Sequence, residues 1–256
     1  MGLLPGSAQI LLDLSREHSF AGSLLTLGKQ NVLVTPDQWR AMANPLGDIP
    51  TERHLRWNTD YITSDWFFKS LGFDAVASLD VSTYEGATYQ RDLNKPGVSP
   101  WPGKIPQFDF VFDGSTIEHI FHLPNVLENI FYLLKPGGRV LHMSPSNHFM
   151  DDGFYQLSPT FFLDYYRANH WPHSFMYLHY MTANIKTGNS QTIIETADRL
   201  EPYDPAKLAE VSSRFWRHGD QLCETIFMAT KAAGATYGCM PFQHRYAQHD
   251  YWRAGL

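Results

Sequence analysis

The sequence predicts an α/β fold with a doubly wound, mostly parallel sheet that carries helices on both faces. Residues 108–112 form a short apolar and aromatic run with the length of a buried strand. Apolar side chains then recur at helical spacing between residues 127 and 134, and a second apolar run begins at residues 140–143. Because a strand, a helix and another strand in succession form the unit of a parallel sheet covered by helices, this segment indicates the fold class.

Length and composition exclude several classes of protein. The 256 residues are 43% hydrophobic and 18% charged, which is typical of a globular chain long enough for one α/β domain with insertions. The formal net charge of −6 argues against a nucleic-acid backbone as the main partner. No apolar run reaches the length of a membrane span, and the first residues do not form a signal peptide. With only two cysteines, we expect a reducing, cytoplasmic setting.

The first 60 residues contain a helix, the first core strand and an insertion. We expect residues 1–22 to form a helical extension and residues 23–27 to form the first strand, which Gly28 ends. The segment 31–60 is longer than an ordinary strand-to-helix connection, and Thr35-Pro36 within it is a helix start. Because the insertion follows the carboxyl end of a strand, we expect it to act as a lid.

Two more strands follow, each with an acidic residue at or after its end. Residues 75–80 form the second strand and residues 87–89 a short third strand. Asp80 stands at the tip of the second strand, where a carboxylate could accept both hydroxyl hydrogens of a ribose. A turn cap before Ser82 is the structural alternative for Asp80.

The second half of the chain completes the domain, which we place at residues 23–233. Ser158 followed by Pro159 predicts a helix start, and strands are expected at residues 175–181 and 225–229. A turn at 186–189 indicates a hairpin or an excursion, and residues 206–216 read as a helix. The aromatic tail, residues 234–256, is expected to pack on the domain or on the partner in a homodimer.

Several phrases carry a family resemblance. LLKPGGRVL follows a strand that ends in Asp-Gly-Ser, and TLGKQ, SLDVSTYEGA, RDLN and DDGFYQLSPTFF stand on either side of this segment. Together they resemble class I S-adenosylmethionine-dependent methyltransferases over residues 24–171. The resemblance implies a Rossmann-like sheet of seven strands and S-adenosyl-L-methionine as the cofactor. The chain departs from the family's Gly-x-Gly turn, since only Gly28 stands after the first strand.

The resemblance also implies a set of cofactor-binding residues. Asp92 would accept from the adenine amino group and Leu93 would cover the ring, while the backbone amides at 113–116 would hold the carboxylate of the methionine half. The implied cofactor-binding residues are Leu27, Gly28, Asp80, Val81, Asp92, Leu93, Asp113, Gly114, Ser115 and Thr116.

Candidate catalytic residues lie in the loops near the same edge. His119 is expected at the start of the helix after the fourth strand, Asn147 follows the fifth strand, and Tyr155 lies in the next loop. Aromatic rings suit a sulfonium, and Phe154, Tyr155, Tyr177 and Tyr180 are available. The 12 histidines show no His-Glu-x-x-His and no zinc spacing, so we expect no metal.

Three functions stay open from the sequence. The first is a methyltransferase that acts on a small-molecule acceptor and releases S-adenosylhomocysteine. The second is an enzyme of the same fold that cyclises the cofactor to azetidine-2-carboxylate and releases methylthioadenosine. The third is a non-catalytic protein that keeps the fold. No membrane or nucleic-acid partner is expected in any of them.

Overall fold

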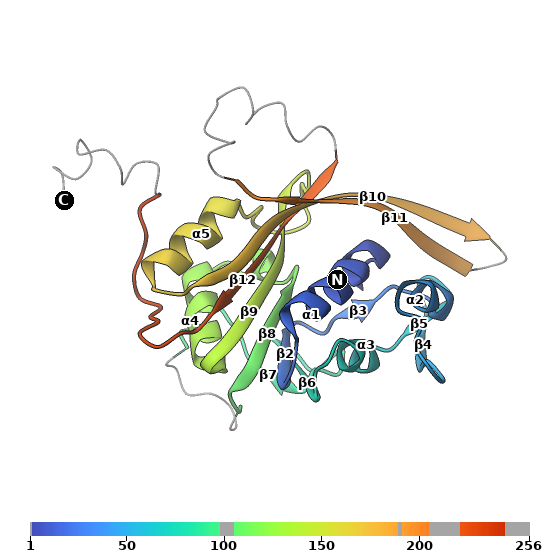
Figure 1. Ribbon diagram of the computed structural model, residues 1–256, viewed down its shortest axis with the longest axis horizontal. Helices are drawn as coiled ribbons and strands as arrows, with labels where there is room; N and C mark the ends of the chain where they lie inside the picture. Colours follow the sequence, from blue (N-terminus) through green and yellow to red (C-terminus); the bar gives the residue numbers. More distant parts are fainter. Residues whose placement is uncertain (1, 98–104, 189–190, 205–220, 244–256) are drawn as a thin grey trace.

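The computed structural model describes residues 2–97, 105–188, 191–204 and 221–243. A mixed sheet with the strand order β11-β10-β12-β9-β8-β2-β6-β7 forms its centre (Figure 1). The strands of this sheet are β2 (Ser23–Leu27), β6 (Ala75–Asp80), β7 (Tyr89–Gln90), β8 (Phe108–Gly114), β9 (Leu134–Asn147), β10 (His173–Gly188), β11 (Gln191–Pro202) and β12 (Leu222–Thr230). The helices are α1 (Pro5–His18), α2 (Pro36–Ala43), α3 (Ser64–Ser70), the 3₁₀ turn η1 (Ile117–His119), α4 (Leu123–Leu133) and α5 (Pro159–Ala168).

Five strands form the parallel part of the sheet. β2 pairs in parallel with β6 on one side and with β8 on the other, and β7 and β9 extend the sheet in parallel beyond them. The chain therefore runs outward from β2 to β7 and then returns to the opposite side of β2. This reversal is the switch point of a doubly wound fold, where ligands bind outside the carboxyl ends of the strands. The predicted doubly wound, Rossmann-like fold is confirmed.

The sheet has eight strands rather than the seven implied by the resemblance. β12 lies between β9 and β10 and is antiparallel to both. Residues 186–188, which were expected in a turn, belong to β10, and β11 pairs with β10 along its whole length to form a hairpin. The second arm of this hairpin therefore joins the sheet as an edge strand, which corrects the strand count.

Successive side chains along the strands pack alternately into two apolar layers, one on each face of the sheet. Phe110 and Phe112 of β8 pack with α1, α2 and α3, whereas Val111 packs with α4 and α5 on the other face. Each fully buried apolar side chain of this size stabilises the fold by about 1.5–3 kcal/mol relative to exposure. Because helices cover both faces, the strands are apolar on both sides (Figure 1).

The insertion at 31–60 lies beside α1 and the β10–β11 hairpin (Figure 1). It contains β3 (Asn31–Val32), α2, β4 (Thr51–His54) and β5 (Thr59–Ile62). Thr35 and Gln38 cap each other at the start of α2, as the Thr-Pro start predicts. Gln38 Nε2 also donates to the carbonyl of Ile194 at 2.6 Å, so α2 is fixed to β11.

The described part of the C-terminal segment contacts α4 and α5. The hydroxyls of Tyr237 and Tyr132 lie 2.9 Å apart, and Tyr165 donates to the carbonyl of Tyr237 at 3.0 Å. The helix expected at 206–216 and the tail beyond residue 243 lie outside the described residues. Within the described residues, no helix combines the length and the apolar character needed to cross a membrane.

Candidate functional site

A pocket of about 380 Å³ opens at the carboxyl ends of β2, β6 and β8 and at the loop after β7. This volume falls in the range of small-molecule sites. The residues that line it are Gly28, Lys29, Gln30, Leu79, Asp80, Val81, Glu85, Arg91, Asp92, Leu93, Asn94, Ser115, Thr116, His119 and Ile120. Eight of these lining residues, from Gly28 to His119, are ones that the sequence predicts for the site. The 31–60 insertion contributes none of the lining.

Gly28 forms the turn between β2 and the pocket wall. Its φ of +72° belongs to the left-handed region, which favours glycine. Its N–H donates to the carbonyl of Leu79 at 2.8 Å, and its carbonyl accepts from Thr26 Oγ1 at 2.9 Å. A Cβ at this position would lie 3.0 Å from Thr116 Oγ1, another residue of the wall. The turn is therefore tight, and a side chain would crowd the pocket.

Asp80 ends β6 with its carboxylate at the pocket. Oδ1 accepts from the N–H of Ser82 at 3.1 Å, which is the turn-capping role that the sequence offered as the alternative. Among the described residues, no hydrogen bond is made to Oδ2. The side chain can therefore cap the turn and still offer an acceptor to a ligand.

The loop after β7 is fixed by its own hydrogen bonds and by α4. Asp92 Oδ1 accepts from the N–H and the amide nitrogen of Asn94, at 2.9 and 3.1 Å. The bond from the Asn94 N–H is the main cause that lowers the pKa of Asp92 below its ordinary value. Asn94 Oδ1 accepts in turn from the N–H of His122, and buried Arg91 donates to Asn129 Oδ1 at 3.0 Å. The pocket thus has an ionised carboxylate on a rigid loop.

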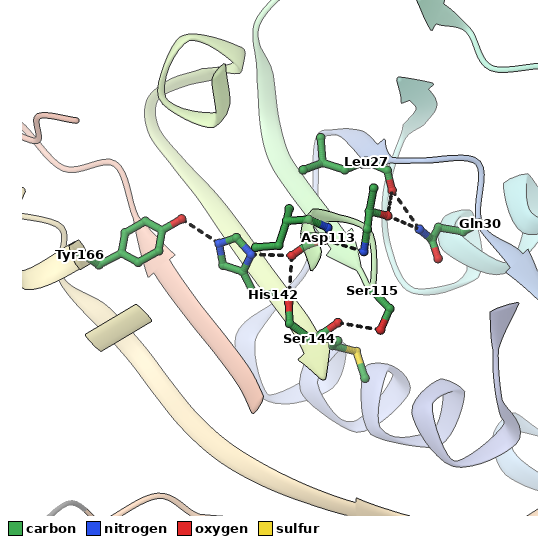
Figure 2. Close-up of polar contacts among 10 residues, drawn as sticks. Leu27, Gln30, Asp113, Ser115, His142, Ser144 and Tyr166 are labelled. Carbon is green, nitrogen blue, oxygen red and sulfur yellow. Dashed lines mark hydrogen bonds and ion pairs between the residues drawn. The ribbon is translucent and has the colours of Figure 1, made fainter. Parts of the chain in front are cut away.

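Asp113 lies inside the molecule instead of facing the pocket. It is completely buried, and its Oδ2 lies 2.7 Å from His142 Nδ1 and accepts from Ser144 Oγ at 3.1 Å. His142 Nε2 lies 2.7 Å from the hydroxyl of Tyr166, which completes a buried polar chain (Figure 2). Burial raises the pKa of Tyr166 well above its ordinary value.

The backbone amides at the end of β8 are already bound within the protein. The N–H of Ser115 donates to the carbonyl of Met143 at 2.8 Å. Those of Thr116 and Ile117 donate to Asp113 Oδ1, at 3.1 and 3.2 Å. This corrects the expectation that these amides hold a ligand carboxylate, because their hydrogens are directed at Asp113 and at β9.

Lys29 and Gln30 supply polar groups at the same wall. Lys29 is half-buried and lines the pocket. Gln30 is 2% exposed, its Nε2 donates to the carbonyl of Leu27, and its Oε1 is buried with no partner among the described residues (Figure 2). An orphaned buried acceptor is costly, and a ligand that donates a hydrogen bond would satisfy it.

Glu118 and His119 belong to the short turn η1 rather than to the start of α4, which begins at Leu123. His119 lines the pocket with its side chain 39% exposed, whereas Glu118 is completely buried. Desolvation is the main cause that raises the pKa of Glu118 to about 9, and the charge of Asp113 adds to it.

The remaining predicted residues lie outside the pocket lining. Leu27 is buried, and its carbonyl accepts from Thr116 Oγ1 at 2.7 Å. Gly114 packs against Phe112 and Gln30, so it leaves no room for a side chain. Asn147 ends β9 opposite Cys223, and Tyr155 donates its hydroxyl to the carbonyl of Phe121 at 2.8 Å.

Sequence reasoning missed seven of the lining residues, although most are neighbours of predicted ones. Lys29 and Gln30 follow Gly28, and Arg91 and Asn94 flank the predicted pair at 92 and 93. Adjacency to Gly28 was the available signal for Lys29. Glu85 had none, because it belongs to the loop between β6 and β7.

Fold and site together define a doubly wound α/β protein with a pocket, lined by both polar and apolar residues, at the switch point of its sheet. No protein-family model matches the chain, and no curated protein matches it.

Several solved structures to which the chain is similar are methyltransferases. A candidate methyltransferase from Bacillus halodurans is 10% identical, with 87% of this chain and 98% of that chain covered and a TM-score of 0.45. The N-methyltransferase NodS from Bradyrhizobium japonicum, in complex with S-adenosyl-L-homocysteine, is 9% identical (87% and 85% covered, TM-score 0.41). Phosphoethanolamine N-methyltransferase 2 from Haemonchus contortus, in complex with S-adenosyl-L-methionine, is 14% identical (90% and 54%, TM-score 0.43). We infer the function of this chain from its own pocket.

Proposed function

We propose that the chain is an S-adenosyl-L-methionine-dependent methyltransferase that acts on a small-molecule acceptor. The observation that carries the proposal is the convergence of Gly28, Asp80 and Asp92 on one pocket at the switch point. These residues stand at or just after the carboxyl ends of three neighbouring parallel strands, so the sheet itself sets their spacing.

The lining residues suit the chemical groups of this cofactor from end to end. The free oxygen of Asp80 would accept from the ribose hydroxyls, and Asp92 would accept from the adenine amino group, with Val81 and Leu93 against the ring. At the other end, Lys29 offers a positive charge for the carboxylate of the methionine half.

The orphaned oxygen of Gln30 tests the fit independently. Gln30 Oε1 is buried at the pocket wall without a hydrogen-bond donor in the described part of the chain. The α-ammonium group of the cofactor is a donor only, so it would satisfy this atom. We therefore assign Gln30 to the methionine half, together with Lys29.

The bound cofactor would supply an electrophilic methyl group on a sulfonium. The residues of this chain would hold the acceptor in line and exclude water. His119 is the exposed polar side chain where η1 meets the pocket. Next to it, the ring centroids of Phe121, Phe154 and Tyr155 lie within 6.4 Å of one another. We assign the acceptor to this side of the pocket, with Asn147 farther along the same edge.

Calorimetry with the cofactor followed by mass spectrometry of the products tests the proposal. We expect binding, and S-adenosylhomocysteine that accumulates only when an acceptor is added from a panel of amines, phenols and carboxylates. Methylthioadenosine formed without an acceptor would favour the cyclising enzyme instead. Absence of binding would overturn the proposal.

The proposal also includes a cytoplasmic setting and a homodimer. Cys223 and Cys239 are both free thiols, which supports a reducing compartment and hence the cytoplasm. Homodimer formation stays a prediction, and light scattering on the purified chain tests it.

A further inference from the structure

Three side chains that can bind metal ions meet beside the pocket. Glu118 and His119 come from η1, and Asp152 comes from the loop after β9. One ligand atom from each residue lies within 4.8 Å of the others, and Glu118 Oε1 is 3.9 Å from His119 Nε2. Ligands that share one cation at about 2.1 Å are about 3–4.2 Å apart, so a small movement of the exposed Asp152 would complete the set.

The two segments are fixed to each other by the backbone. The N–H groups of Phe154 and Tyr155 donate to the carbonyl of Glu118, at 2.8 and 3.3 Å. A Cβ on Gly153 would lie 2.9 Å from that carbonyl oxygen and 3.1 Å from Glu118 Cγ. The approach of Asp152 to Glu118 is therefore built into the fold and does not depend on a flexible side chain alone.

Glu118 itself points to a missing ligand. Its side chain is completely buried, and neither carboxylate oxygen has a hydrogen-bond partner among the described residues. Buried carboxylates are normally paired or coordinate metal ions, so a cation would supply the partner that both oxygens lack.

We propose that Glu118, His119 and Asp152 form a binding site for a divalent cation at the edge of the pocket. Two carboxylates and one imidazole suit Mn²⁺ and related ions, and three protein ligands leave open positions for water or for a small molecule. The sequence led us to expect no metal because the ligands come from two separate segments and show no spacing motif. The cation site does not depend on which molecule fills the pocket.

Electron paramagnetic resonance of Mn²⁺ measures this site without any enzymatic assay. We would treat the full-length chain, with any affinity tag removed, with a chelator, desalt it and titrate it with Mn²⁺. We expect one ion per chain, and an affinity at least about tenfold weaker for Asp152→Asn and for Glu118→Gln. Asp151→Asn is the matched control, because Asp151 is a neighbouring carboxylate outside the cluster, and it should bind Mn²⁺ as the unchanged chain does.

The other possible results of the titration either overturn the cation site or separate it from the proposed function. Asp152 is on an exposed loop, so its variant decides the matter even if Glu118→Gln does not fold. Absence of bound Mn²⁺ at about millimolar concentration, or equal affinity in the chain with and without Asp152→Asn, would overturn the inference. Retained binding of S-adenosyl-L-methionine in the presence of chelator would show that the proposed function stands without the cation site.

Discussion

At the scale of single residues, Gly28 gives the sharpest prediction. Gly28→Ala forces a residue that has a Cβ to adopt a left-handed φ, which costs about 1–2 kcal/mol of stability. It also places a methyl group against the lining residues Gln30 and Thr116. We expect the cofactor Kd to rise by about tenfold or more in calorimetry.

Gly47→Ala is the control for Gly28→Ala. Gly47 has a similar φ of +88°, but a Cβ there would have nothing within 4 Å. We expect it to lower stability without changing the cofactor Kd. Equal effects of the two changes on affinity would mean that Gly28 matters only through its backbone.

Asp80 tests the proposed contact with the ribose. Asp80→Ala should weaken cofactor binding by about 1–3 kcal/mol, the loss expected for a charged hydrogen-bond acceptor. Asp74 lies just before β6, at the end of the strand away from the pocket, so Asp74→Ala should leave the affinity unchanged. Calorimetry on both variants measures the difference, and an unaltered affinity for Asp80→Ala would remove this residue from the site.

Asp113 shows what residue-level reasoning missed. Phe110 and Phe112 face the layer of α1, whereas Val111 faces the layer of α4 and α5. Asp113 follows Val111 by two positions, so the alternation of a strand directs it under the second layer, where it meets His142. The alternation of side chains along the strand could be read from the sequence. The pairing of Asp113 with His142, which lies 29 positions further along the chain, could not.

At the scale of elements, the hydroxyl of Tyr166 joins α5 to β9 through His142. Tyr166→Phe removes the partner 2.7 Å from a completely buried imidazole nitrogen, which should lower the free energy of unfolding by about 1–3 kcal/mol. Urea unfolding measures the change. Tyr84→Phe is the control, because Tyr84 is 93% exposed and its loss should alter stability by no more than about 0.5 kcal/mol.

Elements whose signals are local could be predicted from the sequence. Thr35-Pro36 and Ser158-Pro159 begin helices because their side chains accept from the backbone of the first turn. The eighth strand could not be predicted in the same way. Residues 191–202 become a strand only because β10 offers an unpaired edge, and this pairing is a tertiary interaction.

At the scale of the whole molecule, His179 joins the antiparallel half of the sheet. It is buried between Asp198 of β11 and Glu224 of β12, at 2.7 and 3.2 Å. Burial alone would lower the pKa of His179, but the two carboxylates outweigh it and raise the pKa to about 9. Asp198 also contacts Gly6 of α1, where a Cβ would clash, so the cluster also fixes the N-terminal helix.

The raised pKa of His179 predicts a stability that depends on pH. The protonated histidine contributes fully below its unfolded pKa of about 6.5, and this contribution is lost as the pH rises through about 9. Urea unfolding between pH 6 and pH 9.5 should show a loss on the order of a few kcal/mol relative to His179→Gln. Parallel pH profiles for the two proteins would contradict this.

Every described residue that lines the pocket belongs to the stretch between 28 and 120, and the described residues of β10, β11 and β12 contribute none of the lining. The molecule therefore separates two tasks along its length. Changes in the hairpin end of the sheet are therefore expected to leave the contacts made by the pocket lining unaltered.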